Sequence, residues 1–138
     1  MKRIARCCCE EIGIEVEGLP FLHVVCHCDN CKRRTGSAFG IAAYFEDSQI
    51  VRYIGEPSVW ARKDTPFGDR NLHFCSNCGT TLYWKYTQVD GTGLAGGCFT
   101  DDPLPEPTMT IAQGDHVYDW VKLPDHWDRT EPGDQEQN

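Results

Sequence analysis

Nine cysteines in a chain of 138 residues are the feature that most constrains what this protein can become. Seven of them fall into three short clusters: Cys7 with Cys9, Cys75 with Cys78, and the run Cys26-His27-Cys28-Asp29-Asn30-Cys31. The N-terminus carries no apolar run that would serve as a secretion signal, so we expect a cytoplasmic, reducing location. Structural disulfides persist in oxidising compartments instead. The clusters therefore predict metal binding, and the thiolate ligands favour zinc, two ions per chain.

Two of the clusters complement each other. The sequence Cys75-Ser76-Asn77-Cys78-Gly79 is typical of a zinc knuckle, in which a turn directs two sulfurs at one metal. Cys7 and Cys9 are two positions apart, so in an extended strand their side chains share one face. Structural zinc normally takes four ligands in a tetrahedron. We therefore expect these four cysteines to form a closed structural site that ties the N-terminus to the middle of the chain.

The remaining cluster offers three ligands, Cys26, Cys28 and Cys31. Three protein ligands with an exchangeable fourth position are the usual arrangement of catalytic zinc. Three thiolates on a divalent ion leave a net charge of minus one, which disfavours a hydrolase. Soft sulfur ligands favour a thiol as the fourth ligand, held as thiolate near neutral pH. We predict that these cysteines form a catalytic zinc site for a small thiol.

A basic run, Lys32, Arg33 and Arg34, follows Cys31 directly. These residues are candidate substrate contacts, because guanidinium and ammonium groups attract a carboxylate-bearing thiol. The alternative interpretation is a solvated surface run. The net charge of the whole chain is -8, which would repel phosphate backbones and anionic lipid, so we expect no nucleic-acid or membrane partner.

Cys8 and Cys98 lie outside the clusters, and we interpret both as packed small residues. Two alternatives stay open. Cys98 is a candidate fourth ligand that would close the second site, and a disulfide involving Cys8 or Cys98 would indicate an oxidant or metal sensor. We expect His27 to pack or to be exposed rather than to bind metal. The side chains expected to fill the core are Trp60, Trp84, Trp120, Trp127, Tyr83 and Tyr86, whereas Phe39 and Tyr44 are the better pocket candidates.

Short runs of alternating hydrophobic residues, bounded by Gly, Pro, Asp or Asn, predict a mainly β fold. The expected strands lie near residues 12–16, 21–25, 38–45, 49–54, 58–61, 80–86 and 94–99. Helix is expected only after Asp29 and near Tyr118 to Val121. Residues 101–107 read as a surface loop. We expect one domain over residues 1–128 and a disordered acidic tail over residues 129–138, where apolar anchors are lacking.

With these residues in hand, the chain resembles the glutathione-dependent formaldehyde-activating enzyme family, which also includes centromere protein V. The resemblance rests on the three cysteine clusters, on Gly36-Ser37-Ala38-Phe39-Gly40, and on Phe74 to Thr80 with Leu82. It implies an all-β zinc fold of several small coiled sheets. It also implies a structural zinc on Cys7, Cys9, Cys75 and Cys78, and a second zinc on Cys26, Cys28 and Cys31. The chain departs from the family pattern at Glu10, usually glycine, and at Thr110, commonly histidine.

The resemblance implies carbon–sulfur bond formation or cleavage, typified by adding glutathione to formaldehyde to give S-hydroxymethylglutathione. Our leading hypothesis is a zinc-dependent carbon–sulfur lyase or synthase acting on small thiol adducts, with glutathione as the thiol that the family suggests. The rival hypothesis is a non-catalytic zinc module whose two metals are structural and whose surface binds other proteins. A free fourth position at the second site distinguishes the two. The oligomeric state stays open.

Overall fold

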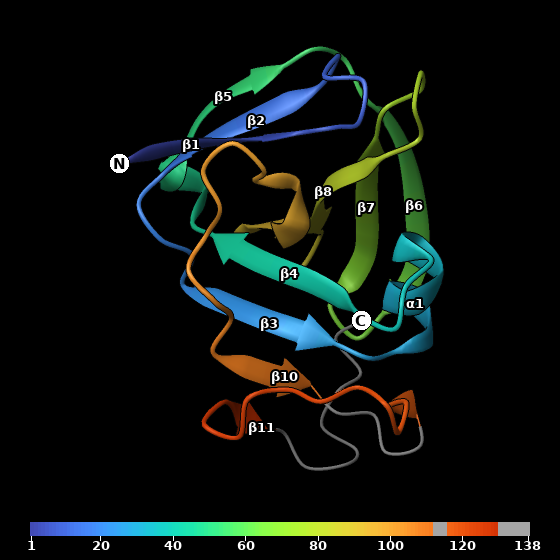
Figure 1. Cartoon of the computed structure of the whole chain (residues 1–138). Coiled ribbons are helices and arrows are strands. Elements are labelled where there is room, and N and C mark those ends of the chain that lie inside the picture. Colours follow the sequence, from blue (N-terminus) through green and yellow to red (C-terminus); the bar gives the residue numbers. More distant parts are fainter. Residues whose placement is uncertain (112–115, 130–138) are drawn as a thin grey trace.

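The computed structural model describes residues 1–111 and 116–129, and eleven strands dominate them (Figure 1). The strands are β1 (Lys2–Arg6), β2 (Gly13–Glu17), β3 (Leu22–Cys26), β4 (Gly40–Phe45), β5 (Ile50–Ile54), β6 (Ser58–Thr65), β7 (Gly68–Phe74), β8 (Thr81–Tyr86), β9 (Thr92–Ala95), β10 (Met109–Ile111) and β11 (Asp128–Arg129). The helices are α1 (Asp29–Thr35) and two short 3-10 turns, η1 (Asp47–Gln49) and η2 (Gly96–Cys98). The predicted mainly β, single-domain fold is confirmed.

The strands form two sheets. The smaller has the order β1-β2-β5 and is antiparallel throughout. The larger has eight strands in the order β11-β10-β3-β4-β9-β8-β7-β6, with parallel pairing where β10 meets β3 and β11 and antiparallel pairing elsewhere. In Figure 1 the smaller sheet crosses the top of the view above β4 and β3, and α1 lies beside β6 and β7.

The larger sheet buries both of its faces, because successive side chains along a strand point in opposite directions. In β4, Ala43 and Phe45 join one hydrophobic cluster together with the core of the three-stranded sheet. Ala42 and Tyr44 face the opposite cluster, together with Trp84 of β8. This sheet is therefore a wall between two halves of the core, and each half contains one group of cysteines.

Most of the predicted strands are present, and the differences have local causes. The expected strand over 94–99 ends at Ala95, where two glycines introduce η2 instead. The helix expected near Tyr118 to Val121 is wrong: it is a single turn, closed by the Val121 N–H donating to the Tyr118 carbonyl at 3.0 Å. Four strands, β1, β7, β10 and β11, were not predicted.

The helix after Asp29 is confirmed, but Cys28 caps it rather than Asp29. At the other end of the chain, Arg129 closes β11, while residues 130–138 of the expected tail lie outside the described residues. The loop expected over 101–107 contains no strand or helix. Within the described ranges, no helix is both long enough and apolar enough to cross a bilayer.

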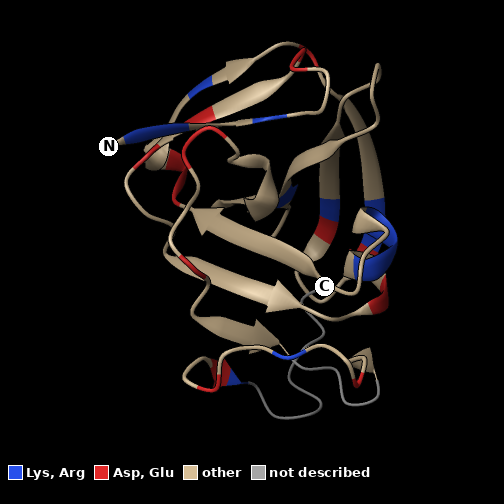
Figure 2. Ribbon diagram, viewed as in Figure 1, with Lys and Arg blue, Asp and Glu red and all other residues tan. Residues whose placement is uncertain are grey.

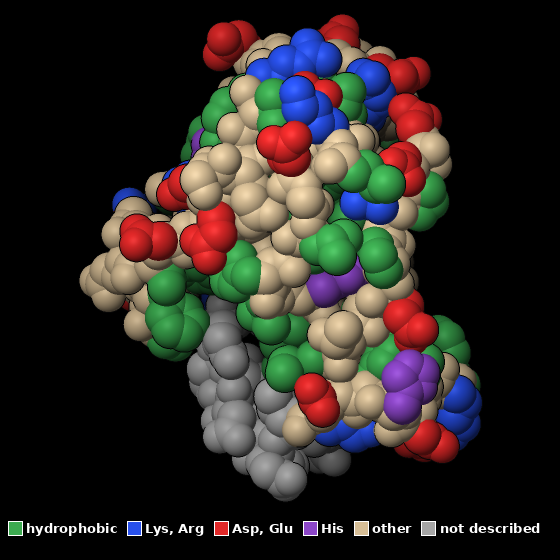
Figure 3. Space-filling view, turned by 90° about the vertical axis from the view of Figure 1, so that its left-hand side faces the viewer, with side chains coloured by type: hydrophobic (Ala, Val, Ile, Leu, Met, Phe, Trp, Pro, Cys, Tyr) green, Lys and Arg blue, Asp and Glu red, His purple; other side chains and the backbone are tan. Residues whose placement is uncertain are grey.

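Charged side chains are unevenly placed along the ribbon (Figure 2). The basic residues Lys32, Arg33 and Arg34 gather on α1, with acidic Asp29 at the start of the helix. Acidic, basic and hydrophobic side chains are intermixed on the face of Figure 3. The basic character of α1 is thus local, in a chain that is acidic as a whole.

Two candidate metal centres

The first cysteine group brings together Cys7, Cys9, Cys75 and Cys78, whose sulfurs all lie within 4.8 Å of one another. The Cys9 sulfur is 3.7 Å from that of Cys7 and 3.6 Å from that of Cys75. Four sulfurs bound tetrahedrally to one zinc, each at about 2.3 Å, would be separated by roughly 3.8 Å. The spacing therefore fits a single ion held by four thiolates. These four cysteines are the set that the sequence predicted for the structural site.

The route by which Cys7 and Cys9 converge differs from our expectation of a shared strand face. β1 ends at Arg6, and the chain then turns, with the Glu10 N–H donating to the Cys7 carbonyl at 3.0 Å. The Ile12 N–H donates to the Cys7 sulfur at 3.3 Å. Glu10 closes this turn with φ of 67°, a left-handed conformation that favours glycine. Cys7 and Cys9 are therefore brought together by a turn, as Cys75 and Cys78 are, rather than by a shared strand.

The second pair follows β7 in a tight turn. The Gly79 N–H donates to the Cys75 carbonyl at 2.8 Å, and Gly79 has φ of 81°, which a residue with a Cβ rarely adopts. The hydroxyl of Thr80 lies 3.3 Å from the Cys78 sulfur. Hydrogen bonding from Thr80 lowers the pKa of Cys78 to about 5, so the turn favours the thiolate that a metal requires.

The second cysteine group, Cys26, Cys28 and Cys31, is also held within 4.8 Å, and all three residues are buried. Cys26 ends β3, Cys28 caps α1, and Cys31 lies in the first turn of the helix. The Cys31 N–H donates to the Cys28 sulfur at 3.4 Å. Hydrogen bonds from the Cys26 and Cys31 thiols lower the pKa of Cys28 to about 2, and the contact with Cys28 raises the pKa of Cys26.

This group stops at three ligands. Among the described residues, no other Cys, His, Asp or Glu has its ligand atom within 4.8 Å of all three sulfurs. Cys98 packs against both hydrophobic clusters without joining either cysteine group. Cys8, which was also expected to pack, is exposed. His27 lies between two of the cysteines but turns away, and its Nε2 is 2.9 Å from the Thr110 hydroxyl. The three sulfurs therefore leave a fourth coordination position for another group.

The three basic residues after Cys31 have different surroundings. Lys32 donates to the His116 carbonyl and lies 3.9 Å over the Tyr118 ring, so it connects α1 to the C-terminal segment. Arg33 is exposed. Arg34 interacts electrostatically with Cys31 and stacks 4.6 Å over Trp84, and burial lowers its pKa. Of the three, Arg34 is the residue in contact with the cysteine group.

Sequence reasoning missed Arg70, a second arginine at this site. It lies on β7 with 1% of its surface exposed, and its guanidinium is 4.5 Å from the Trp84 ring. Neither Arg34 nor Arg70 forms an ion pair with a carboxylate among the described residues. Three thiolates on a divalent metal would carry a net negative charge, which these two buried cations can offset. The sequence did contain a signal for the burial of Arg70. It lies two positions before buried Leu72 on β7, so the two side chains point to the same face of the sheet.

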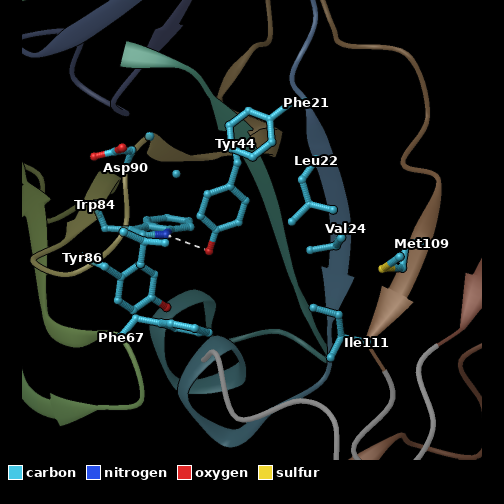
Figure 4. Close-up of a pocket in the computed structure, with 13 residues that line it drawn as sticks. Phe21, Leu22, Val24, Tyr44, Phe67, Trp84, Tyr86, Asp90, Met109 and Ile111 are labelled. Carbon is cyan, nitrogen blue, oxygen red and sulfur yellow. Dashed lines mark hydrogen bonds between the residues drawn. The ribbon is translucent and has the colours of Figure 1, made fainter.

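An apolar cavity of about 230 Å³ opens on the same side of the larger sheet (Figure 4). Aromatic side chains form one wall and aliphatic side chains from β3 and β10 form the other. The lining includes Tyr44, Phe67, Trp84, Tyr86, Val24 and Met109. Trp84 Nε1 donates to the Tyr44 hydroxyl at 3.3 Å. Trp84 and Tyr86, interpreted as core filling, are buried and at the same time line this cavity. The same interpretation is wrong for Trp60 and Trp120, which are exposed.

A more polar groove of about 400 Å³ lies between the end of α1 and the turn at Gly79 and Thr80, and Phe39 contributes to its wall. Arg34, Thr35, Ser37, Ala95 and Cys98 are among the residues that line it. Arg34 thus reaches both the groove and the Cys31 side chain. Arg34 therefore connects the groove to the three-cysteine group, although none of these three cysteines lines the groove or the cavity.

Comparison with known proteins gives a family and a similar fold. A family model described as "Glutathione-dependent formaldehyde-activating enzyme" matches residues 2–115. The crystal structure of a Rhodobacter sphaeroides protein has a similar fold, with a TM-score of 0.53 and 24% sequence identity, covering 72% of this chain and 88% of that one. No curated protein matches the sequence significantly.

Proposed function

This chain belongs to the glutathione-dependent formaldehyde-activating enzyme family, and on that premise we propose that it is a zinc-dependent carbon–sulfur lyase or synthase acting on small thiol adducts. The observation that carries the proposal is the group of three buried thiols, Cys26, Cys28 and Cys31, with a fourth position left by the described residues. A zinc ion held there would lower the pKa of a substrate thiol and keep it as thiolate.

The chain's own residues have distinct roles in this proposal. Cys26, Cys28 and Cys31 would hold the metal as thiolates, and the Cys31 N–H donates to the Cys28 sulfur. Arg34 and Arg70 supply positive charge without a competing carboxylate nearby, which stabilises an additional anionic sulfur. Cys7, Cys9, Cys75 and Cys78 hold a second, structural zinc.

The polar groove along α1 suits the hydrophilic part of the thiol. Arg34 lines it, and exposed Arg33 lies on the same helix, so both can contact a carboxylate such as those of glutathione. Lys32 already donates to the His116 carbonyl, and we assign it the lesser share in substrate binding.

Cobalt substitution tests the proposal. We expect two metal ions per chain, and a thiolate-to-cobalt absorption band that grows when glutathione is added. Cys28→Ser should lose one metal and the response to glutathione. Cys8→Ser, a matched control at an exposed cysteine outside both groups, should retain both. A band that is indifferent to thiols in the wild-type protein would instead favour a non-catalytic zinc module.

A further inference from the structure

We propose that the electrophile used by this centre is a neutral aldehyde carrying an aryl or branched alkyl group of about benzyl size, bound in the cavity of Figure 4. The inference rests on the proposed function and adds the substrate class to it. Formaldehyde has one carbon and no side group, so it would leave such a cavity empty.

The strand register places the cavity next to the three-cysteine group. Val24 and Cys26 are two residues apart on β3 and therefore share one face of the sheet. Ile111 is the direct partner of Cys26 across the β10–β3 pair, and Met109 is the partner of Val24. Val24, Met109 and Ile111 all line the cavity. A substrate sulfur near Cys26 would thus have the cavity beside it.

The size of the cavity selects the occupant. An apolar cavity of roughly 150 Å³ is known to hold a benzene molecule, whereas drug-sized ligands occupy roughly 300 Å³ or more. At about 230 Å³, this cavity accommodates a benzyl group. The aromatic wall of Tyr44, Phe67, Trp84 and Tyr86 favours a flat or branched hydrocarbon group.

The charges that line the cavity and the groove also indicate where each substrate binds. Among the described residues that line the cavity, Asp90 is charged, and there is no lysine or arginine. The carboxylates of glutathione would meet an acidic side chain and no cation in this space. Arg34 lines the groove along α1 instead. We therefore assign the polar thiol to the groove and the hydrocarbon part of the aldehyde to the cavity.

Tyr44 is the polar group suited to the aldehyde oxygen. Its hydroxyl accepts a hydrogen bond from Trp84, and burial raises the pKa of Tyr44, so the phenol stays protonated near neutral pH. In the reaction, the thiolate sulfur attacks the carbonyl carbon, the carbon–oxygen π bond breaks, and the oxygen takes up the proton that the thiol lost. The product is a hemithioacetal, and the reverse reaction returns the aldehyde and the thiol.

The cavity can be tested without the chemistry, using 4-fluorobenzyl alcohol as the probe and ¹⁹F NMR of the zinc-loaded full chain as the readout. Leu22 lines the cavity and is partly exposed, whereas Leu19 is an exposed leucine outside the lining. We expect the probe to bind the wild-type protein and Leu19→Trp equally. Leu22→Trp should weaken binding by at least roughly tenfold, because its indole competes for the apolar space.

The same variants then separate the substrate class from the activity. With glutathione, Leu22→Trp should lower kcat/KM for (4-fluorophenyl)acetaldehyde by roughly tenfold and leave that for formaldehyde unchanged. Equal effects on both aldehydes, or a probe that binds Leu22→Trp as well as wild type, would overturn this inference and leave the proposed function standing. A cobalt band unresponsive to glutathione, with probe binding intact, would overturn the proposed function and with it the role of the cavity as an aldehyde site.

Discussion

The two cysteine groups lie against opposite faces of one eight-stranded sheet and have contrasting surroundings. The four-cysteine group packs with the aliphatic and aromatic core beneath the three-stranded sheet. The three-cysteine group lies between α1 and β3, beside two arginines that lack carboxylate partners among the described residues, and it shares its side of the sheet with an apolar cavity. The first group supplies four sulfurs although Cys9 is exposed, whereas the three buried sulfurs of the second leave one coordination position for another group.

The difference shows that ligand number alone does not distinguish a structural site from a reactive one. Thiolates of both groups acquire lowered pKa values from hydrogen bonds, at Cys78 to about 5 and at Cys28 to about 2. The second group differs in having the charge of Arg34 close to Cys31 and an apolar cavity whose lining includes Ile111, the strand partner of Cys26. These neighbours give the second group its proposed reactivity, and removing them should make the two groups alike.

The largest expected effect comes from opening the structural group. Cys75→Ser removes one of four ligands that connect distant parts of the chain, and we expect a loss of more than about 4 kcal/mol in the free energy of unfolding. Cys28→Ser should cost much less stability, because its group connects β3 only to the adjoining helix. Thermal unfolding and zinc content of the two variants check this. Equal destabilisation would contradict the division of roles.

Removal of a buried cation should act on the second group alone. We expect Arg70→Met to weaken zinc binding there by about 10- to 100-fold, as is usual for the loss of a supporting group around a metal site. The structural metal should remain. Competition with a chromophoric chelator resolves the two affinities. Arg52→Met, at an exposed arginine on β5, is the matched control and should change neither affinity.

The wall of the cavity depends on Gly93, because a Cβ there would overlap the Trp84 indole and lie 2.6 Å from its Cε2. We expect Gly93→Ala to displace Trp84 and to cost about 2 kcal/mol of stability. Gly97→Ala is the control, since a Cβ at Gly97 meets nothing within 4 Å. Urea unfolding gives the stabilities, and near-ultraviolet circular dichroism reports the position of the indole. Similar losses in both variants would show that the close approach of Trp84 is not the cause.

The smallest effect concerns the turn of the first cysteine pair. Glu10 adopts φ of 67°, so Glu10→Gly should relieve backbone strain and raise the free energy of unfolding by roughly 0.5 kcal/mol, net of the greater freedom of glycine when unfolded. Glu11→Gly, at a neighbouring acidic residue without positive φ, should lower it instead. Urea unfolding of the two variants shows whether each substitution raises or lowers the free energy of unfolding. A loss of stability in Glu10→Gly would show that the contact of Glu10 with Arg6 outweighs the strain.

The sequence predicted which cysteines form each group. The spacing within each cluster identified the ligands, and the four ligands of a structural zinc paired Cys7 and Cys9 with Cys75 and Cys78. It did not predict the route at Cys7 and Cys9, because β1 ends at Arg6 instead of continuing to Cys9 as our explanation required. It also missed β1 and β10, because charged residues in the first and the shortness of the second hide the alternation of a strand. Arg70 was missed because its burial depends on partners far away in the chain.

The separation of the cysteines along the chain has a consequence for how the protein is made. Cys9 and Cys75 are 66 positions apart, so the four-cysteine site cannot exist until more than half of the chain has been synthesised and the large loop has closed. The other three cysteines lie on one short segment and can gather around an ion on a nascent chain. Zinc bound that early belongs partly to the unfolded state, and it adds less to the stability of the native one. The reactive ion can thus arrive first, and the ion that locks the fold arrives last.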